Sequence, residues 1–530
     1  MTRGSMNSRS CPGIVLLLSL LLQVFPAVSA NAQNLPRTES GKPDLQGIWM
    51  VGNSAFANIE DHGARYGLPA GLGVVEGGAL PYRPEALVQR DANFATRAVS
   101  DPYNRCFFPG VPRIMYLDFP FQIFQTDEHV AITFEWNQVF RLIYTNGEPA
   151  LYDGIESWMG NSRGRWEGDE LIVTVKDFND RSWLDSSGNF HSTAMQLTER
   201  YRMLDADTIE YEVTVEDPEV FTRPWVMRMN LHRQTDRERL LEYQCQAELS
   251  ELNGDFERDE RTWYPAPPQP GIAAFDADAV LDLPLPEPTG EIRRLPDGTP
   301  DISGYFSARS GGANYGLEKK VGGGGAPPAQ GVIIDPPEVI LPYQDWARVE
   351  ADDRYLPHRG YDDPTAHCFV AGVPRSHYVP SPFHILQVDG FVVVLHERMS
   401  WRHIDMNRSQ HLVDNIRLWM GDSIGHWEGD TLVVRSSNFN GKTWLNEAGD
   451  VLTHAQSVVE TFTPVSDTEI IYRATVSDPL AYTRPWTIEM LFIRADDDEL
   501  LEVACLEDNN DLQHLRDVRD EYRATQAQEN

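Results

Sequence analysis

The sequence predicts an all-β protein made of two tandem antiparallel β-barrels, or half-barrels, of lipocalin-like form with short peripheral helices. Two observations predict it: an internal repeat, and apolar residues that alternate with polar ones at the two-residue period of β-strands. Runs such as LIVTVKDF and TIEYEVTV show this alternation, and turn sequences such as EGD and LDAD separate them. Sequential strands without intervening helices favour a meander that closes into a barrel.

The repeat is clearest at residues 158–169, where WMGNSRGRWEGD matches WMGDSIGHWEGD at 419–430 in 9 of 12 positions. Around it, PGVPRIMYLDFPFQIFQTD matches AGVPRSHYVPSPFHILQVD, and DPEVFTRPW matches DPLAYTRPW. We therefore predict a first barrel repeat over residues 33–264 and a second over residues 298–530, ending in an acidic helical tail. Residues 265–297 contain LPLPEPTG and form an extended Pro-rich linker between them.

The strands expected in each repeat follow the same order along the chain. In the first repeat they are AITFEW, LIVTVKDF, TIEYEVTV, VMRMNLHR and LLEYQC, and in the second FVVVLHE, TLVVRSS, EIIYRATV, TIEMLFIR and LLEVAC. Short helices are expected at QDWARVEADDRYL and in the C-terminal tail.

The first 32 residues have the pattern of a signal peptide. Arg3 and Arg9 precede the apolar run GIVLLLSLLLQVF, and the small-residue sequence AVSANAQ follows it. The run is shorter than the roughly 20 residues that span a bilayer. We expect a periplasmic or secreted chain with no membrane insertion after cleavage. Its net charge of −35 disfavours nucleic acid as a partner.

Four cysteines remain after the predicted cleavage, two in each repeat. The repeat aligns Cys106 with Cys368 and Cys245 with Cys505, so each unit has one early and one late cysteine. In an exported protein this pattern predicts the disulfides Cys106–Cys245 and Cys368–Cys505. Four buried thiols or a metal site are the alternatives, although no C-x-x-C spacing supports a metal.

The combination of PDLxGxW, C…GVPR, GxSxGxWEGDxL, NFNxxxWL and DPxxxTRPW resembles a widespread family of exported bacterial proteins. The resemblance covers nearly the whole mature chain, in duplicate, and it implies export but no particular reaction. The expected barrels are also similar in architecture to lipocalins and to two-barrel carotenoid hydratases. That likeness concerns the fold alone and implies no shared catalytic motif.

Both repeats contain G-x-S-x-G, the pattern of a serine hydrolase nucleophile elbow, around Ser162 and Ser423. An elbow serine lies between a strand and a helix. Here WEGDELIV and WEGDTLVV follow, which predicts a hairpin that turns at Gly168 and Asp169. We therefore expect these serines to be turn residues and not nucleophiles.

Several polar and aromatic residues occur in both repeats and are candidates for binding. In the second repeat, Glu397 ends a predicted strand, Arg375 lies in GVPR and Arg484 lies in TRPW. Trp419 and Trp444 recur from the first repeat, where they match Trp158 and Trp183. Structural ion pairs and core packing compete with binding of a small substrate for each of these residues.

Histidines distinguish the repeats, with four of the 14 before the linker and ten after it. Aligning the repeats replaces Gln122 by His384, Phe134 by His396 and Arg141 by His403. Glu397 and His403 are an even number of residues apart, and His384 would approach from the neighbouring strand. A carboxylate beside an imidazole is suited to acid–base chemistry near neutral pH.

We therefore predict Glu397, His403 and His384 as catalytic residues. Surface histidines without a function are one alternative. A metal site of His384, His396 and His403 is another, but H-x-H and H-E-x-x-H spacings are lacking, so we predict no metal and no cofactor. The substrate-binding candidates are Arg375, Arg484, Trp419, Trp444 and His396.

The function expected from these features is a cofactor-free lyase, hydratase or isomerase that acts on a small, partly apolar or glycosidic compound. A non-catalytic carrier of an apolar ligand is the alternative. Histidines that cluster in a cavity of the second repeat would favour the enzyme. A large cavity lined by tryptophan and aliphatic residues would favour the carrier.

Overall fold

The computed structural model describes Met1 and residues 35–64, 70–247, 283–322, 327–398, 400–495, 498–507 and 509–529. The predicted signal peptide, apart from Met1, and residues 265–282 of the predicted linker lie outside the described residues. The proposed bounds of the two repeats and of the linker stay predictions.

The first barrel is a closed ring of nine strands, each hydrogen-bonded to the next, with the last paired to the first. All neighbours are antiparallel except the fourth and fifth strands, which are parallel. The strands are β1 (Gly47–Val51), β2 (Phe121–Gln125), β3 (His129–Phe134), β4 (Phe140–Tyr144), β5 (Asn161–Glu167), β6 (Glu170–Lys176), β7 (Gln196–Asp205), β8 (Thr208–Glu216) and β9 (Trp225–Arg233).

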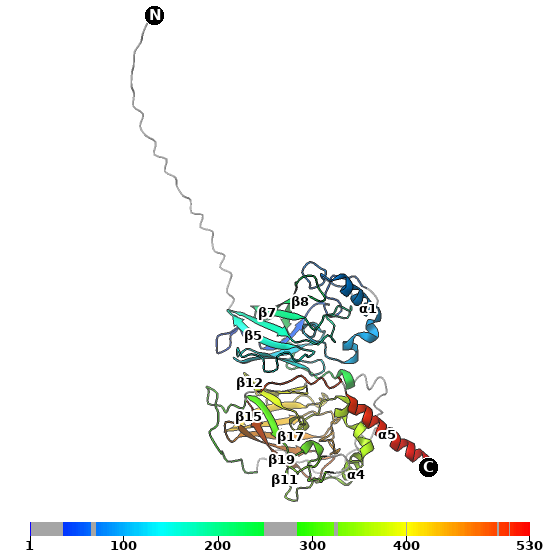
Figure 1. Ribbon diagram of the computed structural model, residues 1–530. Coiled ribbons are helices and arrows are strands. Elements are labelled where there is room, and N and C mark those ends of the chain that lie inside the picture. The colour runs from blue at the N-terminus through cyan, green and yellow to red at the C-terminus, as the bar shows by residue number, and fades with distance from the viewer. Residues whose placement is uncertain are drawn as a thin grey trace.

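The second barrel repeats this order and closes where its first strand pairs with its last. The strands are β10 (Gly304–Arg309), β12 (Phe383–Val388), β13 (Phe391–His396), β14 (Ser400–Asp405), β15 (Asp422–Glu428), β16 (Thr431–Ser437), β17 (Ser457–Pro464), β18 (Glu469–Ser477) and β19 (Trp486–Arg494), with the short β11 (Ile333–Asp335) added beside β19. The predicted all-β fold of two tandem barrels is confirmed (Figure 1).

The alternation in the sequence corresponds to side chains that point alternately into a barrel and away from it. Along β8, every second residue from Ile209 to Val215 is buried and the residues between them are partly exposed. The predicted hairpin is also present, since β5 ends at Glu167 and β6 begins at Glu170. Gly168 in its turn has φ +64°, a conformation that glycine adopts at little steric cost.

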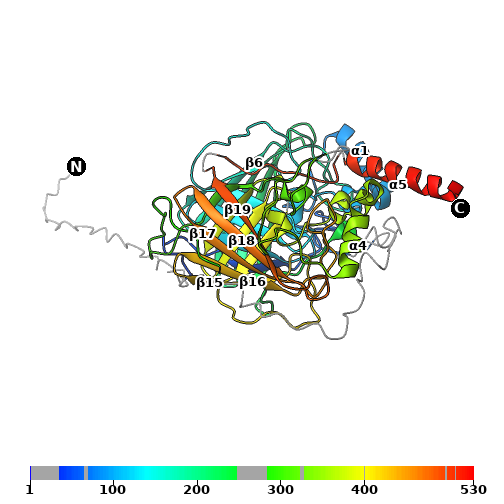
Figure 2. The ribbon, with the colours of Figure 1, turned by 90° about the horizontal axis from the view of Figure 1, so that it is seen from below.

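Three longer helices lie at one side of the two barrels (Figure 2). The predicted helices α4 (Asp345–Arg354) and α5 (Asn510–Glu529) are present, and α1 (Pro84–Ser100) was not predicted. Among the residues of α1 just Ala86 is buried, and its larger apolar residues Leu87, Val88 and Val99 are exposed. No helix within the described ranges is both long and apolar enough to cross a membrane.

The barrels pack against each other through the outer faces of β2–β3 and β12–β14 (Figure 1). Leu386, Val393, Leu395 and Trp401 of the second barrel belong to the same buried apolar cluster as the core of the first barrel. The Trp401 indole donates a hydrogen bond to the main-chain oxygen of Phe134 at 3.0 Å. The two barrels therefore share a continuous apolar contact.

The last predicted strand of each repeat, LLEYQC and LLEVAC, is not a strand. Residues 234–247, here called the first arm, and residues 498–507, the second arm, lie outside the barrel strands and contact both barrels, and the first arm ends in a helical turn at 245–247. The alternation misled the prediction because each arm also places alternate residues on different surfaces.

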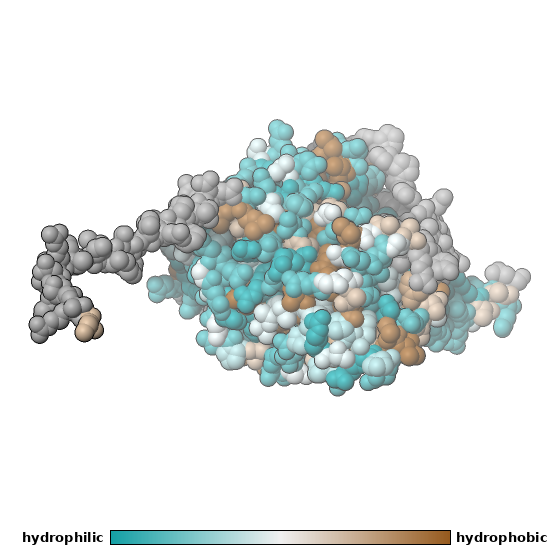
Figure 3. Space-filling view, turned by 90° about the horizontal axis from the view of Figure 1, so that it is seen from above, coloured by the Kyte–Doolittle hydropathy of each residue, from teal (hydrophilic) through white to brown (hydrophobic). Residues whose placement is uncertain are grey.

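The outer surface fits the acidic composition of the chain. Viewed from above, the face is covered mainly by hydrophilic residues, and hydrophobic residues form small separate groups (Figure 3). The described part of this face shows no extended hydrophobic patch.

Candidate functional site

Both predicted disulfides are present, and each ties an arm to its own barrel. Cys106 is bonded to Cys245 and Cys368 to Cys505, closing sequence separations of 139 and 137 residues. Two disulfides indicate an oxidising, extracytoplasmic environment.

Each arm also binds the opposite barrel through a glutamate. The Glu502 carboxylate of the second arm accepts hydrogen bonds from the main-chain N–H groups of Trp158 at 2.8 Å and Met159 at 2.9 Å. Glu242 of the first arm accepts bonds from the corresponding groups of Trp419 and Met420. The arms therefore cross between the barrels in a reciprocal way.

Glu397 fixes the second arm. Its Oε1 accepts a hydrogen bond from the main-chain N–H of Leu501 at 3.2 Å, as Glu135 does from Leu241 at 2.9 Å in the first repeat. Burial raises the pKa of Glu397, while the bond from Leu501 lowers it. The Glu397 carboxylate therefore holds the second arm in place against the second barrel.

His403 and His384 lie between the barrels and not inside either one. The His403 ring stacks on Trp401 at 4.2 Å between ring centroids, and its Nε2 is 3.1 Å from the Thr133 hydroxyl of the first barrel. His384 faces His129 of the first barrel at 5.1 Å. In the described part of the chain Glu397 contacts Leu501, and the two histidines contact the first barrel, so the structure does not bring the expected acid–base pair together.

The physical reason is the register of β13 and β14. His403 pairs with Val393 in the middle of β13, whereas Glu397 comes after the last residue of that strand, His396. His396 instead points into the barrel, towards His377 and Phe383. Because His396 lies on the other face of the sheet from His384 and His403, these three histidines do not form a metal site either.

An arginine that the sequence comparison missed occupies the interior of each barrel. Arg402 donates to Glu460 Oε1 at 2.9 Å and also bonds Oε2, and Tyr472 donates to Oε1 at 2.8 Å. In the first barrel Arg141 bonds Glu199 in the same way. Arg141 therefore corresponds to Arg402 and not to His403.

The serine of each G-x-S-x-G motif forms a hydrogen bond with the buried arginine of its own barrel. Ser162 accepts a hydrogen bond from Arg141 Nε at 3.0 Å, and Ser423 accepts one from Arg402 Nε at 3.1 Å. Both serines are buried inside strands β5 and β15, and the preceding glycine Gly160 provides the turn. The expectation of a turn serine was wrong, because β5 begins at Asn161 and β15 at Asp422, each one residue before the serine.

A cavity of about 100 Å³ lies at the end of the second barrel, beneath both arms. Its polar lining consists of Asn137, Gln244, Gln246, Asn314, Thr365, Arg375, Ser376, Ser381, His396, Arg398, Ser400 and Glu447. Apolar groups and the two disulfides complete it: Cys106, Phe107, Phe108, Cys368, Phe369, Val370, Ala371, Val379, Val503, Ala504, Cys505 and Leu506. Of the predicted site residues, His396 and Arg375 meet here.

The cavity is polar where the first barrel is apolar. His396 of the second barrel occupies the position of Phe134 in the first. His396 pairs with Ser400 across the β13–β14 hairpin, as the main-chain N–H of Phe134 bonds the main-chain oxygen of Val139 in the first barrel. Aligned through the GVPR motif, Ser376 likewise replaces Ile114. Phe134, Val139 and Ile114 are all buried in the first barrel, so the same fold packs these positions with apolar side chains.

His396 is the buried imidazole at this cavity. It is 4% exposed, and neither ring nitrogen forms a well-aligned hydrogen bond, although the main chain of Ser400 lies close enough to raise its pKa. Burial and the neighbouring His377 and Arg402 hold its pKa well below the usual 6.5. Arg402 donates to His377 Nε2 at 3.1 Å, which places the proton of neutral His377 on Nδ1. His396 is therefore a neutral base at physiological pH.

Arg375 and Glu447 lie on the opposite part of the lining. Arg375 forms two hydrogen bonds to Asp363, at 2.9 and 2.8 Å, and a third to the Asn314 side-chain oxygen at 3.0 Å. The Asn314 amide donates to Glu447 at 2.8 Å. Burial raises the pKa of Glu447, although the positive charge of Arg375 lowers it.

The remaining candidates lie elsewhere. Arg484 is exposed and pairs with Asp335. Trp419 packs against Phe369 at the base of the first arm, and Trp444 is buried under Arg354. Neither tryptophan lines the cavity.

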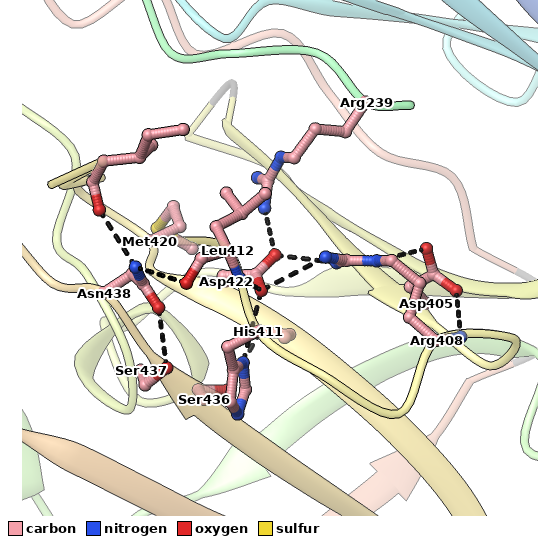
Figure 4. Close-up of polar contacts among 12 residues, drawn as sticks. Arg239, Asp405, Arg408, His411, Leu412, Met420, Asp422, Ser436, Ser437 and Asn438 are labelled. Atoms are coloured by element: carbon pink, nitrogen blue, oxygen red, sulfur yellow. Dashed lines mark hydrogen bonds and ion pairs between the residues drawn. The ribbon is translucent and has the colours of Figure 1, made fainter. Parts of the chain in front are cut away.

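Asp422 is the centre of a second polar cluster, which lies at the start of β15 (Figure 4). Its carboxylate accepts hydrogen bonds from Arg408 at 2.7 Å and His411 at 3.2 Å, and it also pairs with Arg239 of the first arm. Burial alone would raise the pKa of Asp422. The hydrogen bonds from His411 and Arg408 outweigh burial and hold this pKa well below its usual range. This saturated carboxylate anchors the arm.

Comparison with known proteins does not assign a family. No protein-family model matches the chain, and no curated protein matches it. A solved structure of a protein of unknown function from the DUF3598 family of Nostoc punctiforme shares 7% identity with a TM-score of 0.14. The match covers 71% of this chain and 88% of that one. A likeness this low supports no conclusion about function.

Proposed function

We propose that this protein is exported to the periplasm or secreted, and that it performs cofactor-free acid–base chemistry on a small molecule held in the second-barrel cavity. A lyase, hydratase or isomerase is the class that fits this chemistry. The disulfides support export, because such bonds persist in oxidising compartments.

One observation carries the proposal: polar groups replace apolar ones at one cavity, in one of two otherwise similar barrels. A buried polar group without a partner costs about 1–3 kcal/mol. His396 leaves two such nitrogens and Ser376 one such hydroxyl. The first barrel has apolar side chains at these positions, which supports a role for the polar groups of the second barrel in contacting a ligand.

The lining supplies the groups that acid–base catalysis requires. Neutral His396 is the proposed proton acceptor, and burial and Arg402, which lower its pKa, make it a weak one; Glu447, whose pKa burial raises, is the proposed donor. In an isomerisation one proton is removed and one is returned, and in a dehydration the returned proton leaves with the hydroxyl as water. Arg375 lines the same cavity with its charge paired to Asp363.

A carrier of an apolar ligand has less support. Buried side chains fill the described interior of both barrels, and the cavity beneath the arms is lined by many polar groups. A carrier for a large apolar molecule would need an apolar cavity of several hundred Å³.

The experiment is a turnover screen on small metabolites with wild type, His396→Phe and Glu447→Ser. Each substitution introduces the residue of the first repeat, since Ser186 matches Glu447, and this favours correct folding. We expect both variants to lose at least 100-fold in kcat/KM, in line with general acid–base catalysis.

The control is His426→Arg, which restores Arg165 of the first repeat at an exposed position and should keep full activity. Circular dichroism and thermal melting verify that each variant is folded. A folded His396→Phe variant with wild-type turnover would contradict the proposal.

A further inference from the structure

We propose that the ligand of this cavity is a neutral, hydroxyl-bearing molecule, either a small polyol or the end of a sugar, and not a carboxylate or a phosphate. This inference rests on the proposed function, because it names the substrate class of the same site.

The charges of the lining favour a neutral ligand. Arg375 is the buried cation of the cavity, and both of its terminal nitrogens already bind Asp363. The Glu447 carboxyl group accepts a hydrogen bond from the Asn314 amide and adds no positive charge. Arg398 is exposed, where solvent and salt screen its charge. An anionic ligand would therefore find no unpaired buried cation in the described lining.

The hydrogen-bonding groups of the lining match hydroxyls. The hydroxyls of Ser376, Ser381 and Ser400 can each donate and accept, as a ligand hydroxyl does, and the side-chain oxygen of Gln244 can accept. Two buried residues of the lining, Ser376 and His396, have polar atoms without a partner. A molecule with several hydroxyl groups would satisfy these atoms together.

The apolar part of the lining matches the carbon skeleton of such a molecule. Phe369, Phe107 and Val379 border the same cavity and would pack against C–H groups. The exposed Arg398 borders the cavity, so a longer sugar would extend past it into solvent.

The test measures binding of matched neutral and acidic ligands to the mature protein by saturation-transfer NMR with competition. The pairs are glycerol with glycerate, glucose with glucuronate, and galactose with galacturonate, and toluene serves as an apolar probe. We expect at least one neutral member to bind at least tenfold more tightly than its acid. Ser376→Ile and His396→Phe should each abolish that binding, and His426→Arg should retain it.

Tighter binding of the acids or of toluene would overturn the inference and leave the proposed function standing. Binding that persists in folded Ser376→Ile and His396→Phe variants would place the sugar elsewhere and overturn it as well. If no polyol binds while turnover of another substrate depends on His396, the inference fails alone. Turnover that is independent of His396 removes the proposed function.

Discussion

At the scale of single residues, a buried arginine–glutamate pair organises the interior of each barrel. Arg402 and Glu460 are almost completely buried, and Tyr472 and Ser423 complete their hydrogen bonds. Arg402 also orients His377, which lies 5.2 Å from the His396 ring. The pair therefore connects the stability of the barrel with the protonation state at the cavity.

Replacing Glu460 by Gln should destabilise the protein strongly. The substitution leaves the Arg402 charge buried without its counter-charge, which costs about 3–5 kcal/mol in comparable buried pairs. Urea denaturation followed by tryptophan fluorescence measures the loss. Arg484→Ala removes an exposed ion pair and should leave the unfolding midpoint unchanged. A Glu460→Gln midpoint equal to that of wild type would contradict the role given to this pair.

The sequence contained a signal for this pair that the comparison of histidines overlooked. The GVPR segments are 262 residues apart, but the WMG segments are 261 apart. One residue is therefore missing from the second repeat between them, and placing the gap before Arg402 aligns it with Arg141. His403 then matches Leu142, an outward-facing position, which explains why it lies between the barrels.

At the scale of elements, the contact between β2–β3 and β12–β14 buries histidines of both barrels. Burial lowers the pKa of His384 to about 3, with smaller contributions from His129 and Arg494. Burial likewise lowers the pKa of His129 to about 4. These histidines remain neutral in the folded protein over a pH range in which the unfolded chain is protonated.

Acid should therefore weaken the folded state through these residues. Because folding lowers the pKa of His384, this residue does not oppose folding above about pH 6.5, where it is neutral in both states. As the pH falls towards 3, the unfolded chain takes up a proton that the folded protein does not, and the free energy of unfolding decreases. His384→Gln, which introduces the residue found at Gln122, should reduce the loss of unfolding free energy between pH 6.5 and 4.

Urea unfolding at several pH values measures this dependence. His426→Arg, at an exposed position, should keep the wild-type slope. An unchanged slope in His384→Gln would show that this imidazole does not couple folding to pH.

The strands were predictable because apolar and polar residues alternate where one face of a strand is buried. In a barrel wall the same face points inwards along the whole strand, so the alternation is regular. The arms obey a different rule. Glu242 faces the second barrel, whereas the neighbouring Leu241 is tied to Glu135 of the first. In the arms, the two-residue alternation of apolar and polar residues arises because successive side chains contact different barrels. A single sequence does not distinguish this pattern from that of a strand.

At the scale of the whole molecule, the duplication predicted two barrels and both disulfides but not the way in which the barrels join. The repeats have diverged where they meet different neighbours: His403 faces Thr133 of the other barrel, and Leu142 takes its place in the first repeat. The cavity was missed for the same reason. Its lining comes from both repeats and both arms, so no local pattern records it.

Removing one disulfide should loosen the whole assembly and not one barrel alone. The Cys106→Ala, Cys245→Ala double variant opens a link of 139 residues, for which the chain-entropy model gives a loss of roughly 4–5 kcal/mol as an upper figure. The far end of the first arm would lose its disulfide to the first barrel and stay joined to it through β9 alone, while Glu242 and Arg239 still bind the second barrel.

Because that arm joins the barrels, they should then unfold separately. Calorimetry is expected to resolve two transitions in place of one, and limited proteolysis should cut within residues 234–247. The Glu242→Gln variant with intact disulfides is the control and should unfold in one transition. A double variant that unfolds in a single transition and resists cleavage would show that the apolar contact at Trp401 couples the barrels without the arms.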